Sequence, residues 1–216
     1  MISYKDGTYE KTYADAMSSL LQESYSIKDD PQIAYETNSI FQFDYTTNAI
    51  KVVDNEFVVS FDYSDYMEDH EYIVRKNLDY YTKNFLSNMQ LQSVIIRLKN
   101  NLFSKQAILS LSKDITNHYP AEMYVSFRVR NGVLHTISHL RANNAYGEAL
   151  VNMHIDCALA NEIALALGIK HMSYTHVVDG FHIYHRDLMK AKRFVSRVRN
   201  HDIGKREKDE SISGVV

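Results

Sequence analysis

The feature that most restricts the fold is a run from Ala145 to Leu167 in which apolar residues lie on almost every side of a helix. A helix of this kind has to be buried, because it has no continuous polar side to turn toward water. Gly168 is well placed to end it, since glycine readily adopts the left-handed conformation that follows many helices. We therefore predict a long central helix that the rest of the chain covers.

Three polar residues interrupt this helix at a spacing of four: Glu148, Asn152 and Asp156. Residues four apart lie on the same side of a helix, so the three form a polar stripe. The stripe is either a solvated face or a buried set that needs hydrogen-bonding partners. The spacing alone leaves both interpretations open.

Before the helix, the sequence predicts a β-hairpin. Residues 123–131 and 133–141 are expected to be strands, and Asn131-Gly132 between them is a favoured two-residue hairpin turn. Successive side chains of a strand point to opposite faces. In the second strand, one face carries Val133, His135, Ile137, His139 and Arg141, and the other carries Leu134, Thr136, Ser138 and Leu140.

The rest of the chain is predicted to contain both helices and strands. Helices are expected at residues 13–25, 72–88 and 90–99, and strands at residues 40–45, 57–63, 107–111 and 176–183. No internal repeat or linker divides the chain. We predict a single α+β domain over residues 1–216, with a large sheet beside the buried helix and a flexible tail from about residue 205 to residue 216.

Composition excludes several classes of protein. The 216 residues are 45% hydrophobic, which suits a folded domain with a sizeable core. The net charge of -3 gives no overall attraction to nucleic acid or to an anionic membrane, so neither partner is expected. The single cysteine, Cys157, cannot form an intrachain disulfide. The polar segment from Met1 to Tyr9 lacks the pattern of a secretory signal, and we expect a cytoplasmic protein without a membrane span.

Common sequence motifs for cofactors are absent. The chain has no P-loop, no glycine-rich dinucleotide turn and no paired-cysteine zinc motif. The pairs His182 and His185, and His171 and His176, have neither the HExxH arrangement nor a cysteine partner, so we expect no metal. A Ser-His-Asp triad stays open, because its members meet only in space.

Residues 127–184 carry an ordered series of motifs. The hairpin Phe127-Arg-Val-Arg-Asn-Gly-Val-Leu is followed by Leu140-Arg-Ala-Asn-Asn, by the helix that ends at Gly168, and by His182-Ile183-Tyr184. In this order and spacing the segment resembles the thymidylate synthase and deoxycytidylate hydroxymethylase family. The resemblance implies a thymidylate synthase-like α+β fold, with a large mixed sheet and a long buried central helix.

The resemblance also implies a site for a pyrimidine nucleotide. Arg141 would hold the phosphate through charge-assisted hydrogen bonds. Asn152 offers both a donor and an acceptor, which suits the O4 and N3–H edge of uracil. His182 and Tyr184 would contact the sugar 3′-hydroxyl. The implied nucleotide-binding set is Arg141, Asn144, Asn152, His182, Tyr184 and Lys105.

Departures from the family are concentrated at its chemistry. Its nucleophilic cysteine corresponds to Ala121, and the histidine that follows corresponds to Glu122. The partner-donated arginine pair falls on Lys105 and Gln106, and the phosphate-binding serine on Ala142. The aspartate used against folate falls on Asn144, which cannot accept the two donors of the pterin ring as a carboxylate does, so no folate cofactor is expected.

Three functions fit these observations. The first is a pseudoenzyme that binds a pyrimidine nucleotide, uracil type favoured, a kind of divergent relative that phages also carry. The second is an enzyme with altered acid–base chemistry on such a nucleotide, for which Glu122 and Asp156 are the catalytic candidates, with Tyr124 and His139 as further acid–base groups. The third is a structural or interaction protein that keeps only the fold.

The resemblance implies a symmetric homodimer, because family members pack their sheets back to back. The face with Leu134, Thr136, Ser138 and Leu140 is apolar enough to take part. The acidic segment 62–71 is either a surface loop or an interaction site, and the sequence favours neither.

Overall fold

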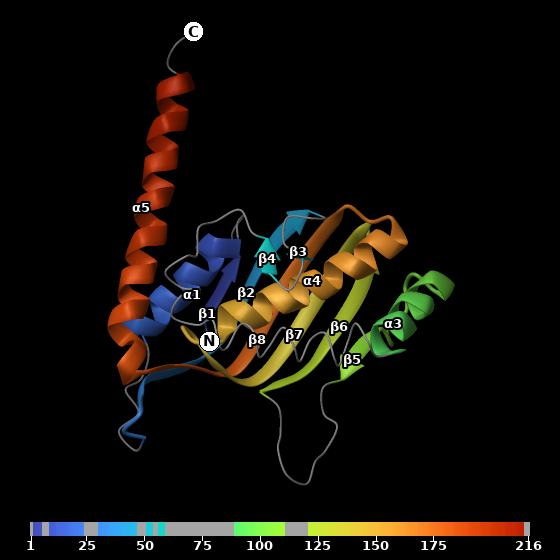
Figure 1. Ribbon diagram of the computed structural model, residues 1–216, viewed down its shortest axis with the longest axis horizontal. Coiled ribbons are helices and arrows are strands. Elements are labelled where there is room, and N and C mark those ends of the chain that lie inside the picture. Colours follow the sequence, from blue (N-terminus) through green and yellow to red (C-terminus); the bar gives the residue numbers. More distant parts are fainter. Residues whose placement is uncertain are drawn as a thin grey trace.

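The computed structural model describes residues 2–5, 9–23, 30–46, 51–53, 56–58, 89–110 and 121–213, with side chains described within residues 11–22, 30–46, 89–110 and 121–200. Its centre is a six-stranded sheet in the order β1-β2-β8-β7-β6-β5 (Figure 1). The strands are β1 (Ile2–Lys5), β2 (Ile33–Thr46), β5 (Ile108–Ser110), β6 (Glu122–Arg130), β7 (Val133–Asn144) and β8 (His171–Tyr184). β3 (Lys51–Val53) and β4 (Glu56–Val58) form a separate pair.

The sheet is mixed. β6 and β7 pair antiparallel, β7 and β8 pair parallel, and β8 pairs antiparallel with β2. The hairpin turn lies at Asn131 and Gly132, whose φ angles of 52° and 77° are both positive, as the predicted two-residue turn requires. The expected α+β class with a large mixed sheet is confirmed.

Helix α4 (Ala149–Leu167) lies across one face of the sheet (Figure 1). Most of its residues are buried, as the sequence predicted, and it ends at Gly168, which has a φ of 69° and donates its backbone N–H to Leu165 O. The helix begins four residues later than expected, because residues 145–148 form a turn instead. By length and composition alone its 19 residues could cross a membrane, but most of the helix is buried in the core of the fold.

The other helices lie around the sheet: α1 (Tyr9–Glu23), α3 (Met89–Asn100), the short 3-10 turn η2 (His185–Asp187) and α5 (Leu188–Ser213). α1 packs on α5 through the edge-to-face rings of Tyr13 and Phe194, 5.6 Å apart. α5 projects beyond the body of the molecule (Figure 1). The tail that we expected to be flexible from about residue 205 is helical to Ser213, since it is rich in Lys, Arg and Glu, which favour helices.

The two faces of β7 differ in burial. The face toward α4 carries four fully buried residues: Leu134, Thr136, Ser138 and Leu140. The other face carries four half-buried residues: Val133, His135, Ile137 and His139. The expectation that Leu134, Thr136, Ser138 and Leu140 form a dimer face is therefore wrong. Their face belongs to the core of this chain, because the apolar helix α4 covers it.

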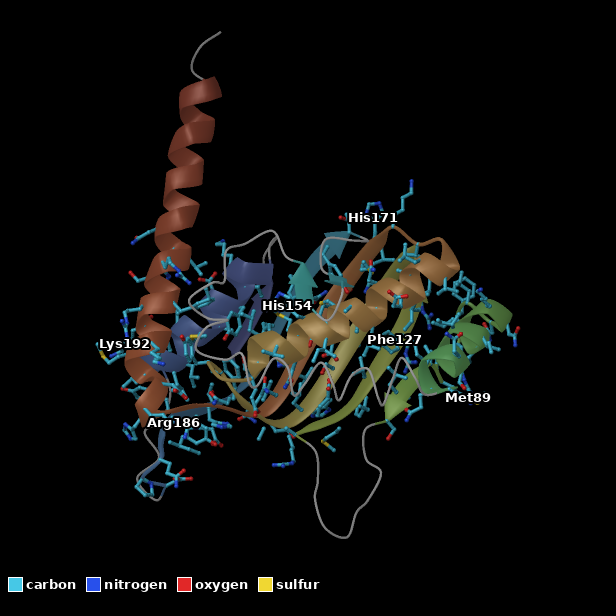
Figure 2. All side chains as sticks on the ribbon, in the orientation of Figure 1. Met89, Phe127, His154, His171, Arg186 and Lys192 are labelled. Carbon is cyan, nitrogen blue, oxygen red and sulfur yellow. The ribbon has the colours of Figure 1, made fainter. Side chains whose placement is uncertain are left out.

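Two strands are longer than predicted. β8 begins at His171 rather than residue 176, and Figure 2 shows His171 and Arg186 at opposite ends of the molecule, with β8 between them. β2 begins at Ile33 rather than residue 40. The expected helix at 72–88 and the acidic segment 62–71 lie outside the described residues, as does most of the expected strand at 57–63.

Candidate functional site

The N-terminal end of α4 meets the ends of three strands. Arg141, near the end of β7, donates its backbone N–H to Ala121 O over 2.9 Å, which brings it beside the start of β6. Ala145 donates its N–H to His182 O over 2.7 Å, which joins the end of β8 to the turn before α4. Asn152 lies in the first turns of α4. Segments from four parts of the chain therefore converge here, with Arg141 exposed and Asn152 half-buried.

The two carboxyl candidates lie on the inner face of the sheet. Ser138 Oγ on β7 donates a hydrogen bond to Glu122 Oε1 over 2.6 Å. The Tyr174 hydroxyl on β8 lies 2.7 Å from Asp156 Oδ2 on α4. Asp156 is 1% exposed, which settles the open question at this residue: this part of the polar stripe is buried and has partners.

The surroundings of the two carboxyls favour their protonated forms. Burial, and next the negative charge of Glu122, raise the pKa of Asp156 well above its ordinary value. Burial also raises the pKa of Glu122, while its hydrogen bond from Ser138 opposes this shift. Neighbouring carboxyls that repel each other titrate as a pair, so the second proton leaves at a higher pH than the first.

A row of polar groups continues from Asp156 through the core. The Tyr174 hydroxyl lies 2.6 Å from His176 Nδ1, and His176 Nε2 lies 3.1 Å from Asn143 Oδ1. Phe41 stacks on His176 with ring centroids 4.6 Å apart. Burial lowers the pKa of His176 to about 3, so this imidazole is neutral near pH 7.

The further acid–base groups proposed from the sequence lie on the opposite face. His139 Nε2 is 3.1 Å from Asp179 Oδ1, and its Nδ1 is 3.4 Å from the Tyr124 hydroxyl. His139 follows Ser138 directly, and neighbouring strand residues point to opposite faces. The structure therefore brings Glu122 and Asp156 together but separates them from Tyr124 and His139.

The residues expected near the sugar lie at the end of β8. His182 Nδ1 is 3.0 Å from Gly180 O, and the His182 and Tyr184 rings meet edge to face at 5.1 Å. The exposed Arg186 places its guanidinium 4.8 Å from the centre of the Tyr184 ring. Sequence reasoning missed Arg186, although its position two residues after Tyr184 was a usable signal.

Asn144 supports the turn before α4. Its Oδ1 accepts hydrogen bonds from the backbone N–H groups of Tyr146 at 3.2 Å and Gly147 at 3.0 Å. A side-chain oxygen used in this way organises a turn, as Asn and Asp often do. The structure thus gives Asn144 a structural role beside the site.

Lys105 lies away from these residues within one chain. It is exposed just before β5, where Ala107 O accepts a hydrogen bond from Phe127 N over 2.8 Å. Phe127 is six residues along β6 from Ala121, which is about 20 Å of extended strand. The structure therefore does not bring Lys105 to Arg141 in the same chain.

Cys157 lies in the core beside Asp156. It is 0% exposed, and burial raises the pKa of its thiol well above the ordinary value. A thiol without a ready thiolate and without access to solvent is a poor nucleophile. Among the residues whose positions are described, no group of three or more His, Cys, Asp or Glu side chains is arranged to hold a metal ion.

The comparisons with known proteins agree with this architecture. The family model described as thymidylate synthase matches residues 72–206, which is more than half of the chain. The chain belongs to the thymidylate synthase family. The solved structure of thermostable thymidylate synthase A from Bacillus subtilis is similar to it with a TM-score of 0.60 and 14% identity, over 89% of this chain and 84% of that one. At this identity the likeness shows the fold alone, and no curated protein matches.

Several site residues were invisible to sequence reasoning. Ser138 was assigned to a dimer face, yet it holds Glu122; Tyr174 was not singled out, yet it joins Asp156 to His176. Both carry polar groups on strand faces that also hold buried apolar residues. The usable signal was the presence of polar residues on the strand face that the apolar helix covers, because buried polar groups need hydrogen-bonding partners.

Proposed function

We propose that this member of the thymidylate synthase family binds a pyrimidine nucleoside monophosphate, uracil type favoured, and does not carry out folate-dependent one-carbon transfer at C5. The observation that carries the proposal is that the backbone segments with Arg141, Asn152 and the end of β8 come together at the N-terminal end of α4. These are the positions that the family resemblance assigns to phosphate, base and sugar.

Arg141 is suited to the phosphate. It is exposed, while its backbone is fixed by the hydrogen bond to Ala121. A guanidinium can donate two parallel hydrogen bonds to phosphate oxygens, and bonds between charged groups are stronger than neutral ones. Arg186, which lies over Tyr184, adds a second cation at the end of β8.

The base and the sugar have matching groups. The half-buried amide of Asn152 can donate to O4 and accept from N3–H of a uracil ring. Tyr184 is half-buried and lies against His182, so its hydroxyl and the imidazole can share one sugar hydroxyl. This set favours a uracil nucleotide over a purine nucleotide because its hydrogen-bonding groups match the O4 and N3–H edge of a single six-membered ring.

Loss of one-carbon transfer follows from the absence of a nucleophile at the aligned position. The family position of the attacking cysteine aligns with Ala121, whose methyl group cannot add to C6 of the base. Cys157 is buried in α4 with a raised pKa and does not replace it. Asn144, at the position that the family uses against folate, has its Oδ1 engaged by two backbone N–H groups, which supports the absence of a folate cofactor.

Isothermal titration calorimetry with dUMP, dCMP, dTMP and their ribonucleotide counterparts tests the proposal. We expect dUMP to bind more tightly than dCMP. Arg141→Ala should weaken binding by roughly 10- to 100-fold, the loss of about 1.5–3 kcal/mol from a charged hydrogen bond. Lys170→Ala is the matched control, because it removes an exposed positive charge at the opposite end of β8. Failure of every nucleotide to bind would leave only the shared fold.

A second function, acid–base chemistry on the bound nucleotide, is favoured by one observation. Glu122 and Asp156, from different elements, interact directly enough for each to affect the other's ionisation. Two carboxyls in different surroundings are a common arrangement for an acid and a base. Proton NMR of dUMP and dCMP incubated with the protein in heavy water would reveal C5–H exchange, deamination or loss of the base in one spectrum. Catalysis that Glu122→Gln abolishes would support this function, and unchanged nucleotides would exclude it.

A further inference from the structure

Four buried side chains form a continuous row of hydrogen bonds on the inner face of the sheet. Asp156 Oδ2 and the Tyr174 hydroxyl are 2.7 Å apart, the same hydroxyl is 2.6 Å from His176 Nδ1, and His176 Nε2 is 3.1 Å from Asn143 Oδ1. None of the four residues is more than 1% exposed. Water is therefore excluded from these bonds, and the protons in the row have to be shared among its members.

The end of the row at Asn143 fixes the direction of its hydrogen bonds. Asn143 Oδ1 is an amide oxygen and can only accept, so His176 Nε2 has to carry a proton and donate it. A neutral imidazole has only one N–H, which leaves His176 Nδ1 as an acceptor. The Tyr174 hydroxyl, at 2.6 Å from Nδ1, therefore donates its single proton to His176.

The direction of these hydrogen bonds also determines whether Asp156 donates or accepts. With an ionised Asp156 the Tyr174 hydroxyl would donate to Asp156 Oδ2 at 2.7 Å, but because Tyr174 gives its only proton to His176, its oxygen accepts there instead. Asp156 must then donate, which requires a protonated carboxyl. An ionised Asp156 would instead need the Tyr174 proton and would leave His176 Nδ1 without a donor.

We propose that the row Asn143–His176–Tyr174 keeps a proton on Asp156 at neutral pH, so that Glu122 is the ionised member of the pair and accepts a hydrogen bond from an N–H or O–H group of the ligand in this site. The identity of that ligand rests on the proposed function, but the protonation of the row does not. Asn143, His176 and Tyr174 are positioning residues in this account, and Glu122 is the residue that contacts the ligand.

The surroundings of the pair support this division. Glu122 is half-buried at the start of β6, beside the Ala121–Arg141 contact, whereas Asp156 is buried. Asn143 Nδ2 is buried and makes no hydrogen bond with other described residues, so a donor is still available in this part of the core. The ionisable groups that face Asp156 are Glu122 from β6, Tyr45 from β2, Tyr174 from β8 and Cys157 from α4. None is a cation that would stabilise an ionised Asp156.

Nitrogen NMR of the ligand-free full chain tests the direction of the row. At pH 7 His176 is expected to be neutral with its proton on Nε2. His154 provides an internal reference with the opposite tautomer, because its Nδ1 lies 2.6 Å from Leu150 O and has to donate. A proton on His176 Nδ1, in the neutral or the charged ring, would overturn the proposal.

Carboxyl titration by carbon NMR in two variants tests the link to Asp156. Tyr174→Phe removes the acceptor of the Asp156 proton, so the pKa of Asp156 should fall by at least half a unit. Tyr45→Phe is the matched control: it removes another buried hydroxyl on the inner face, one that contacts Cys157 and Thr136 and has no hydrogen bond to Asp156, and should change that pKa less. A rise of the Asp156 pKa in Tyr174→Phe would show that Tyr174 donates to a carboxylate and would overturn the proposal. If Tyr174→Phe does not fold, the tautomer of His176 still decides.

Both measurements use the protein without ligand, so they can succeed or fail independently of nucleotide binding. The ligand contact is tested by Glu122→Gln, which should weaken dUMP binding at least 5-fold while His176 keeps its tautomer. Unchanged dUMP affinity in Glu122→Gln would remove Glu122 from the ligand contact. No dUMP binding to the unaltered chain, together with an Nε2 proton on His176, would contradict the proposed function but not the row.

Discussion

At the scale of single residues, the unusual feature of this chain is the number of ionisable groups that its core holds in their neutral forms. Asp156, His154, His176 and Cys157 are all at most 3% exposed. Burial favours the uncharged form of each, so it raises the pKa of acids and lowers that of histidines. Such residues make the stability of the fold depend on pH.

His154 on α4, labelled in Figure 2, gives the first prediction. Burial lowers its pKa from 6.5 to about 4. The neutral ring therefore contributes stability that is complete above pH 6.5 and is lost as the pH falls toward 4. This displacement corresponds to on the order of 3 kcal/mol in the free energy of unfolding. Urea denaturation at a series of pH values should show the loss, and His154→Gln should flatten it. An unchanged pH dependence in His154→Gln would contradict a buried neutral His154.

Asp156 acts with the opposite sign. Its pKa is raised in the folded state, so its contribution to stability is present at low pH and is lost as the pH rises through that raised value. Asp156→Asn keeps a neutral side chain of similar shape and should make the protein more stable above neutral pH than the unaltered chain. Thermal unfolding at pH 6 and pH 9 measures this difference. If Asp156→Asn were less stable than the unaltered chain by the same amount at pH 6 and at pH 9, Asp156 would not be held in its protonated form.

Cys157 allows a simple check of the core. Its thiol is fully buried, and burial raises its pKa. A thiol reagent that detects free cysteine should therefore react with the native protein at least 100-fold more slowly than with the protein in urea, since reaction needs an exposed thiolate. Rapid reaction in the native state would mean that α4 opens readily or that Cys157 faces a solvent-filled site.

Sequence reasoning found some site residues and missed others for a physical reason. Glu122 and Asp156 were proposed as a pair and do converge, because one adjoins the aligned nucleophile position and the other lies on the polar stripe of α4. Ser138 and Tyr174 were missed, because their partners come from other elements and pairing across a sheet leaves no trace in local spacing. His139 was placed with the carboxyls, although its strand position turns it to the other face.

At the scale of elements, the two strongest local patterns in the sequence predicted the observed helix and hairpin. The buried helix and the hairpin follow from apolar periodicity and from Asn131-Gly132, which both act over a few residues. The length of β8 could not be read locally, since its first residues pair with β7 and β2 and gain their extended form from those neighbours. The start of α4 was also misplaced, because the hydrogen bonds from Asn144 Oδ1 that hold residues 145–148 in a turn cannot be read from helical periodicity.

The turn before α4 yields a prediction for Gly147. A methyl group added at this buried position would collide with the side-chain amide of Asn144, which already holds the turn. Gly147→Ala should therefore destabilise the fold by more than 1 kcal/mol and weaken nucleotide binding, because it shifts the start of α4. Gly168→Ala is the control: nothing lies within 4 Å of the added methyl, so only the cost of its φ of 69°, about 1 kcal/mol, is expected. Urea denaturation compares the two, and a smaller effect at Gly147 would contradict this account.

At the scale of the whole molecule, the chain combines a covered sheet face with one whose strands remain half-buried. The second face carries the branched apolar residues Ile40, Val133, Ile137 and Val177 on β2, β7 and β8. Apolar side chains on adjacent strands of one face suit contact with the same face of another copy. We therefore propose that the homodimer expected from the sequence uses the face opposite the one first assigned.

Light scattering after size-exclusion chromatography tests this dimer. We predict twice the 25.0 kDa chain mass, and Ile137→Lys should shift the protein to the monomer because it places a charge in the middle of the face. Leu165→Lys, an exposed position on α4 away from that face, is the control. A monomer for the unaltered chain would exclude the dimer.

The most direct test of the central claim is to map dUMP onto the isotopically labelled protein by backbone amide NMR. The account predicts saturable shifts concentrated at Ala121, Glu122, Arg141, Asn152 and the end of β8, with little change at Lys170 and across α3. The nucleoside without its phosphate should leave the amide of Arg141 almost unshifted. Shifts that are absent, or that gather elsewhere on the fold, would contradict the claim that the N-terminal end of α4 is a nucleotide site.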